Sequence, residues 1–463
     1  MTRPESGRLK AFLVSVSAGA VLSGCSILPD YAPPQMQLTD RYSVLQPIQV
    51  SPRADSAWWT AFHDPVLNSL VDRALAQNLT VAQARARVRE AEALARRAGL
   101  EDIGGDLEVT ASAPDSTETI GLGLDLIFSP RKLAAAAASR ARLDAARSAE
   151  TNARRLVVGE LALAYADLRY AEALLAYRHQ DLRSRQRTLN DINTRLAAGA
   201  ATRLDRVRAE ALVAQTRAQV PQTEAQIAIL QSRIATLLAD PAGRRGLGLA
   251  AGTGQPMPRG GADIGVPADL LRARPDVRQA ERAYAAAVSD LGTARADRYP
   301  RLTLSGVVQA PIGGGSTAES LVAGIALPVF SQPRLAANEA AAQARVEGAL
   351  LAWRDAVLTA VDEVESALIA LSASIRTASA AAQVVRLNQE ALDLSRQLLA
   401  DAGGITVLDI LDRERAVSDA RATLAQAQRD VARDYIRLYT ALGLEDGLGA
   451  PQDLKLAEAV EPG

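Results

Sequence analysis

The sequence predicts a mainly α-helical chain that carries four β-strands and consists of two copies of one structural unit. Two nearly identical octets, FSPRKLAA at 128–135 and FSQPRLAA at 330–337, indicate the duplication. A row of apolar residues at seven-residue spacing follows each octet, and each row ends at a glycine that precedes a Thr-x-x-Asp motif. A repeated unit of strand hairpin, long helix, tight turn and returning helix is typical of elongated, repeat-built proteins.

The composition of the chain excludes several function classes. Among its 463 residues, 52 Lys and Arg nearly balance 53 Asp and Glu, so no overall field favours a nucleic-acid partner. The two histidines, His63 and His179, and the single cysteine have no second ligand at metal spacing. The glycine-rich stretches at 243–261 and 313–315 lack the strand–glycine–helix context of a phosphate loop. We therefore expect no enzyme, no cofactor and no metal site.

The N-terminus has the order of a bacterial export signal, which predicts that residues 1–24 are a signal peptide. Three basic residues precede an apolar run at 11–22, which is too short to cross a membrane as a helix. The sequence Leu-Ser-Gly before Cys25 resembles the lipobox of bacterial lipoproteins, which implies lipidation, including palmitate, at Cys25. Ser26 in that class implies sorting to the outer membrane. A chance cysteine after an ordinary signal is the alternative. We expect residues 25–64 to form a lipidated tether.

The first repeat is predicted to span residues 65–240. It begins with a helix from Val66 to about Leu100, ended by glycines at 99, 104 and 105. Apolar and polar residues then alternate, which predicts a β-hairpin at 106–128. Such a hairpin suits a membrane barrel with a watery lumen, and equally a half-buried soluble hairpin.

A long coiled-coil helix follows the first hairpin. From Arg131 to Ala197 no proline intervenes and the only glycine is Gly159, which predicts one helix of roughly 100 Å. A returning helix is expected at 202–238. Strict seven-residue spacing indicates coiled-coil packing in both copies. The two rows are Leu161, Leu168, Leu175, Leu182, Leu189 and Leu196, and Val364, Leu371, Ala378, Val385, Leu392 and Leu399.

The second repeat is predicted to span residues 268–443, after a Gly/Pro-rich linker at 241–267. The expected order is a helix from Pro275, a β-hairpin at 302–330, a long helix at 333–401 and a returning helix at 406–442, before a C-terminal tail at 444–463. Four strands per chain cannot enclose a lumen, since about eight strands only just fill their own interior. If the strands form a barrel, the chain must oligomerise, and three copies would supply twelve strands.

Both helix turns carry the same predicted cap. Thr202 with Asp205, and Thr406 with Asp409, have the spacing of a capping box. Two further motifs are predicted to be structural. Arg-Pro-Asp at 274–276 has the order of a helix start. The aromatic residues Trp58, Trp59 and Phe62 are expected to anchor the N-terminal segment against the helices.

Five segments together carry a family resemblance. They are WWTAFHDPVL at 58–67, LLRARPDVRQAE at 270–281, ARADRYP at 294–300, LPVF at 327–330 and LYTALG at 438–443. In this order the chain resembles the outer-membrane efflux duct family typified by TolC and OprM, in particular its lipoprotein (NodT-type) branch. The resemblance covers almost all of the mature chain.

The resemblance implies an architecture and a function. The expected assembly is a homotrimer in which a twelve-strand β-barrel in the outer membrane stands on a twelve-strand α-helical barrel that crosses the periplasm. Its periplasmic tip would dock an adaptor protein linked to an inner-membrane transporter of the resistance-nodulation-division (RND) class. The implied function is the exit duct of a tripartite pump that exports small molecules such as drugs. An exit duct for type I protein secretion and a non-conducting periplasmic scaffold lipoprotein are the alternatives.

The resemblance also assigns candidate site residues. Asp409 and Asp412 match acidic positions that ring the periplasmic entrance in the family, although a solvated acid on an amphipathic helix also accounts for Asp412. Its counterpart in the first copy is Arg208, and capping alone explains Asp205. The helix-turn tips expected to dock the adaptor comprise Gly199, Thr202, Asp205, Gly403, Gly404 and Thr406.

Overall fold

A computed structural model describes most of the chain in two compact units. The strand unit comprises Met1–Gln37, Ala84–Glu150 and Pro275–Leu358, and the hairpin unit comprises Leu38–Gln83, Thr151–Arg274 and Thr359–Gly463. The predicted signal peptide, the predicted lipidation site Cys25, Gly403 and the tail at 444–463 lie outside the described residues. The described residues are 31–36, 38, 57–100, 103–112, 117–128, 130–245, 247, 249, 254–259, 274–312, 316–400 and 404–443.

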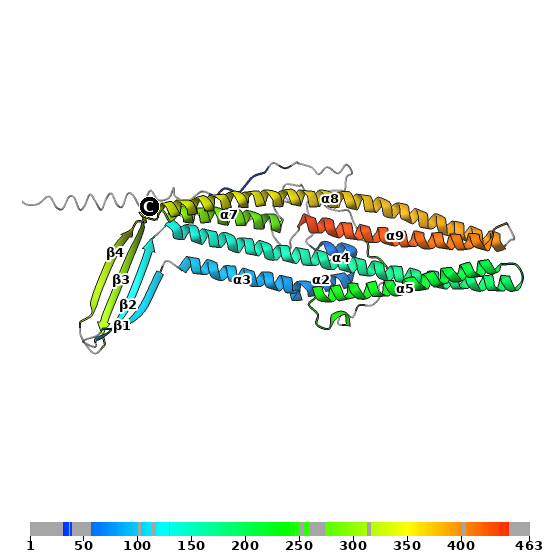
Figure 1. The fold of residues 1–463 in the computed structure, drawn as a ribbon, viewed down its shortest axis with the longest axis horizontal. Helices are drawn as coiled ribbons and strands as arrows, with labels where there is room; N and C mark the ends of the chain where they lie inside the picture. The colour runs from blue at the N-terminus through cyan, green and yellow to red at the C-terminus, as the bar shows by residue number, and fades with distance from the viewer. Residues whose placement is uncertain are drawn as a thin grey trace, which may run out of the picture. The chain divides into compact units, whose positions relative to one another are not determined.

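The strand unit contains one antiparallel sheet built from both copies of the repeat (Figure 1). Its order is β1-β2-β3-β4, and the pairing of Phe128 with Leu302 and of Ile120 with Ala310 joins the two hairpins. The expected four strands are therefore confirmed. Their bounds are β1 (Ile103–Ser112), β2 (Thr117–Phe128), β3 (Arg301–Pro311) and β4 (Ala318–Ala326).

Two details of the first expected helix are wrong. Gly104 and Gly105 do not end it, because they pair with Asp125 and Leu124 inside the β1–β2 ladder. The helix is also broken into α2 (Pro65–Gln77) and α3 (Leu79–Leu100) at Asn78.

Asn78 stabilises this break through both ends of its side chain. Its carboxamide oxygen accepts hydrogen bonds from the backbone N–H groups of Thr80 and Val81, at 2.8 and 3.2 Å, and so caps α3. Its side-chain nitrogen donates to the carbonyl of Leu237 at 2.8 Å, at the end of α5. A tertiary contact therefore fixes a break that the local sequence pattern does not predict.

The long helices follow the prediction closely. Their observed bounds are α4 (Pro130–Ala197), α5 (Arg203–Leu237), α8 (Gln332–Ala400) and α9 (Val407–Leu442), with α7 (Pro275–Ala296) preceding β3. Every residue of the two seven-residue rows is buried or half-buried, as coiled-coil packing requires. None of the helices in the described part of the chain has the length and apolar content to cross a membrane.

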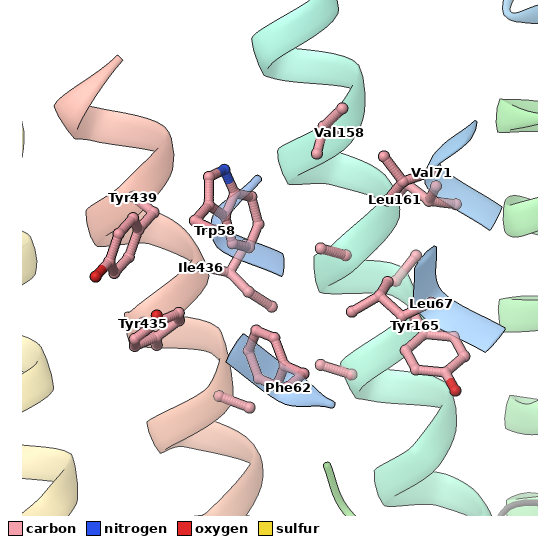
Figure 2. Packing of buried hydrophobic residues seen from close by; sticks show 14 of the residues in the cluster. Trp58, Phe62, Leu67, Val71, Val158, Leu161, Tyr165, Tyr435, Ile436 and Tyr439 are labelled. Atoms are coloured by element: carbon pink, nitrogen blue, oxygen red, sulfur yellow. The ribbon is translucent and has the colours of Figure 1, made fainter. Parts of the chain in front are cut away.

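The core of the hairpin unit contains the aromatic residues of the N-terminal segment. Figure 2 shows Trp58 and Phe62, from the 3₁₀ helix η2 (Trp58–Phe62), between α9 and α4. Trp58 stacks on Tyr439 with ring centroids 6.1 Å apart, and Phe62 meets Tyr435 edge-on at 5.4 Å. The predicted anchoring of this segment is confirmed.

Two close contacts fix the helices of this unit. Arg274 is 1% exposed and donates to the carbonyl of Ala441 at 2.6 Å and to Glu363 at 2.7 Å. It therefore ties the residue before α7 to α8 and to the end of α9. The second contact joins α4 and α9 at Gly159, where a Cβ atom would lie 2.6 Å from Oγ1 of Thr440. Only a glycine permits this approach.

Candidate functional site: the two helix-hairpin turns

The first helix-hairpin turn joins α4 to α5 at residues 198–202. Gly199 has φ 74°, a left-handed conformation that favours glycine after a helix. The backbone N–H of Ala200 donates to the carbonyl of Arg195 at 2.7 Å, which satisfies an otherwise free carbonyl at the end of α4. At the start of α5, Thr202 and Asp205 form the predicted capping box, with the Thr202 hydroxyl 2.6 Å from the Asp205 carboxylate.

The second turn joins α8 to α9 and repeats the cap. Gly404 has φ 77°, and the Thr406 hydroxyl lies 2.7 Å from the carboxylate of Asp409. The backbone N–H of Thr406 donates to that carboxylate at 2.8 Å, and the N–H of Asp409 donates to the Thr406 hydroxyl at 3.4 Å. The structure therefore confirms both predicted capping boxes.

Hydrogen bonds perturb the two capping carboxylates in the same direction. The Thr202 hydroxyl, followed by the Thr202 backbone N–H, lowers the pKa of Asp205. The Thr406 hydroxyl and backbone N–H lower the pKa of Asp409 in the same way. Both carboxylates are therefore anionic at neutral pH.

The acidic residues of the second turn lie on the outer face of α9. Asp409 and Asp412 are exposed, whereas Ile410 and Leu411 between them are 4% and 3% exposed. Leu411 packs in a cluster with Ile192 of α4 and with residues of α5. The start of α9 is therefore held against its neighbours while its two carboxylates face outward.

A buried carboxylate two turns into α9 was not predicted as a site residue. Glu414 is 7% exposed and accepts hydrogen bonds from the hydroxyls of Ser184 and Thr188 on α4, at 3.2 and 2.9 Å. Arg396 of α8 donates to the same oxygen, Oε1, at 2.8 Å. This cluster joins three long helices and both copies of the repeat behind the turns.

The other oxygen of Glu414 is buried and has no hydrogen-bond partner among the described residues. The sequence contained one signal for this burial: Glu414 follows Ile410 by four positions and precedes Val417 by three, and both of these residues are buried. A polar residue in a helical apolar stripe indicates a buried polar contact.

Two further polar contacts join α4 to α9. Ser418 donates to Asp181, whose pKa is raised because burial disfavours its charged form. Farther from the turns, Arg433 forms an ion pair with Asp167. The interface between these helices therefore contains buried and half-buried carboxylates with their donors in addition to its apolar clusters.

No group of three or more His, Cys, Asp or Glu side chains in the described ranges is arranged to hold a metal ion. The site consists of two capped hairpin turns, one with an acidic outer face, supported by a buried polar cluster.

Comparisons with known proteins agree with this architecture. The chain matches the model of a protein family described as outer membrane efflux protein, over residues 70–240 and 266–444. Nodulation protein T of Rhizobium leguminosarum bv. viciae is 35% identical over 458 residues, which cover 95% of this chain and 94% of that protein. The pyoverdine export outer membrane protein OpmQ of Pseudomonas putida is 30% identical over 419 residues, which cover 84% of this chain and 88% of that protein.

The fold also matches solved structures. The structure described as the outer-membrane channel OprN has a TM-score of 0.81 and 28% identity, and the match covers 90% of this chain and 98% of that chain.

Proposed function

Because the chain belongs to the outer membrane efflux protein family, we propose that it forms the exit duct of a tripartite pump that exports small molecules. Proteins of this family are outer-membrane efflux channels, and this chain is an outer-membrane protein of that kind. One observation carries the finer proposal. The two hairpins have the same capped turn, but at the sixth residue of the returning helix the second has an exposed acid, Asp412, where the first has Arg208.

A homotrimer is supported by the surfaces that one chain leaves uncovered. The sheet has two edge strands, β1 and β4, and exposed edges favour pairing with another chain. Three copies would supply twelve strands, more than the roughly eight that fill their own interior. The described part of α8 also exposes a row of large apolar residues, which favours contact with a partner. The row includes Leu351, Leu358, Ile369, Leu387, Leu394 and Leu398.

In this trimer the hairpin turns have two roles. Three copies of Asp409 and Asp412 would converge on the periplasmic entrance, where a ring of carboxylates attracts cations and repels anions. The turn residues Gly199, Thr202 and Asp205, with Gly403, Gly404 and Thr406, would dock a periplasmic adaptor protein, which links the duct to an inner-membrane RND-type transporter. Cys25 would attach the N-terminus to outer-membrane lipid.

The cargo is proposed from the relatives. OpmQ is named for pyoverdine export, and this supports a small molecule as the cargo. A duct for protein secretion is the competing outcome of the test.

The test measures retention of a fluorescent dye in a strain that lacks this gene. Deletion is expected to raise retention, and the wild-type gene is expected to restore efflux. The Asp412→Arg variant should restore less efflux than the wild-type gene, because it places three cations in the proposed ring. Asp419→Arg is the matched control, since Asp419 is an exposed acid about two turns farther along α9.

The outcomes separate the parts of the proposal. If deletion leaves dye retention and drug susceptibility unchanged while a secreted protein disappears from the medium, the small-molecule duct is wrong. If Asp412→Arg and Asp419→Arg restore efflux equally, the acidic ring is wrong even though the duct remains.

A further inference from the structure

A cavity of about 320 Å³ lies in the strand unit, at the base of the sheet. Four segments line it: the start of α4, the end of α7 with the residues that follow, the start of β3 and the end of β4. This volume is near the lower limit of small-molecule pockets, which are about 300–1,000 Å³. The lining includes the charged residues Arg131, Lys132, Asp297 and Arg301, together with Tyr299 and Leu327.

The charge of this lining is positive. Arg131, Lys132 and Arg301 are cationic, and Asp297 is the one acid among the lining residues. Asp297 is already ion-paired with Arg131, at 3.0 Å. Arg301 has no ion-pair partner within the described ranges. Arg131 and Lys132 also stand in the first turn of α4, where the helix dipole disfavours positive charge. Helix stability therefore does not account for the cations at this place.

Besides the Arg131–Asp297 ion pair, other polar contacts hold the walls of the cavity together. Arg295 in the last turn of α7 and Arg298 just after that helix both donate to Glu339 of α8, at 3.1 and 2.6 Å. Gln332 donates to the carbonyls of Arg298 and Pro328, at 3.0 and 3.3 Å. The segment between β4 and α8 is therefore fixed over the end of α7, and the cavity is preformed.

Exposed apolar side chains adjoin the cavity along the chain. Leu133 follows Lys132 directly, and Val329 and Phe330 follow the lining residues Leu327 and Pro328. All of these apolar side chains are exposed, and Phe330 is completely so. Basic and aromatic residues next to exposed apolar residues match the two chemistries of a lipid, an anionic headgroup and acyl chains.

We propose that this cavity binds the headgroup of an anionic phospholipid of the outer membrane. Lys132 and Arg301 hold the phosphate group, for which ammonium and guanidinium groups are the usual protein partners. Leu327, Val329 and Phe330 contact the acyl chains, which removes their apolar surface from water. The cavity holds a headgroup and leaves the rest of the lipid in the bilayer. The proposal rests on the outer-membrane location of the chain and not on its cargo.

Native mass spectrometry of the full-length protein in detergent tests the site directly. Phosphatidylglycerol and phosphatidylcholine are added at equal concentration, and bound lipid is counted for each protein species. Wild type should prefer phosphatidylglycerol by at least about tenfold, since each basic residue near an anionic lipid contributes roughly a factor of five. Lys132→Gln/Arg301→Gln should lose this preference. This variant leaves the Arg131–Asp297 ion pair intact.

The matched control is Arg140→Gln/Arg345→Gln. It removes the same charge from exposed positions of α4 and α8 outside the cavity, and should keep the preference. Phe330→Ser should weaken the binding of both lipids to the same extent, which separates the acyl contacts from the headgroup contacts.

Three results would overturn the proposal. The first is an equal preference for phosphatidylglycerol in wild type and in Lys132→Gln/Arg301→Gln, or no preference in wild type. The second is displacement of the lipid by millimolar inorganic phosphate, which would make free phosphate the ligand. The third is loss of the oligomer in Lys132→Gln/Arg301→Gln but not in the control, which would make the cavity a contact between copies of this chain.

Discussion

The two helix-hairpin turns begin in the same way and diverge within one turn of helix. Thr202 with Asp205 and Thr406 with Asp409 form the same capping box, and both carboxylates have lowered pKa values. Beyond the cap, the side chains of α5 lie mostly toward solvent. Val207 is 48% exposed, whereas its counterpart in α9, Leu411, is 3% exposed.

The charged residues diverge in the same region. Arg208 in α5 corresponds to Asp412 in α9, and both are exposed. Glu210 is exposed and pairs with Arg206 at 3.6 Å, whereas its counterpart Glu414 is buried among donors from α4 and α8. The shared cap is thus a local requirement of the turn. The divergence follows from packing, because this part of α9 contacts both α4 and α8 whereas Val207 and Glu210 of α5 remain exposed.

The largest expected difference between the turns is in packing. Leu411→Ala should lower the free energy of unfolding by about 2–5 kcal/mol, because it leaves a cavity among buried residues. Val207→Ala should change it by less than about 0.5 kcal/mol, since the side chain is half exposed. The midpoints of denaturant unfolding of the purified protein in detergent measure both. Equal shifts would contradict the asymmetry and indicate that Val207 is covered in the assembly.

A smaller difference is expected for the paired glutamates. Glu414→Gln removes the charge that three donors surround, and should cost about 1–3 kcal/mol. Glu210→Gln should cost less than about 0.5 kcal/mol, because exposed ion pairs contribute little. The same unfolding measurement applies. An unchanged free energy of unfolding in Glu414→Gln would mean that the buried cluster does not depend on a carboxylate.

The caps should respond equally. Thr202→Ala and Thr406→Ala should each destabilise their own turn by about 1 kcal/mol, since each removes the acceptor for one backbone N–H. Hydrogen–deuterium exchange of peptides that span each turn measures the loss locally. A response in only one turn would show that the cap of the other turn is held by contacts other than the capping box.

The smallest expected effect is the loss of turn stability on acidification. The pKa of Asp205 and of Asp409 is lower in the folded chain, so the stabilisation that each provides is complete above its usual value of 3.8 and is lost as the pH falls through the lowered value. Hydrogen–deuterium exchange, corrected for its intrinsic pH dependence, should therefore rise in both turns only below about pH 4.

The same experiment on the assembled protein sharpens the comparison. If the proposed ring forms, repulsion between carboxylates raises the pKa of Asp409 relative to that of Asp205. The second turn should then open at a higher pH than the first. Coincident opening of the two turns in the assembly would count against the ring.

The sequence predicted those features that local chemistry determines. α4 and α8 each begin within one residue of the expected position, because a proline marks each start and the seven-residue rows extend to the turns. The two capping boxes were likewise predictable, because the Thr-x-x-Asp spacing is sufficient to form them.

The features that were missed depend on contacts between distant segments. The break at Asn78 requires the carbonyl of Leu237, and the burial of Glu414 requires donors from two other helices. No local pattern specifies these partners. The strand positions of Gly104 and Gly105 were missed because glycine is a common signal for the end of a helix and the ladder pairing that overrides it is not local.

The close approach of Gly159 to Thr440 sets the spacing of α4 and α9 at this point of the hairpin unit. A side chain larger than glycine at position 159 would push α4 and α9 apart at this point and so tilt α4. About 40 residues separate Gly159 from the first turn, a lever arm of about 60 Å at 1.5 Å per residue. A tilt of α4 by about one degree at Gly159 therefore moves the first turn by about 1 Å. A small rotation far from the turn is thus enough to change what the turn contacts.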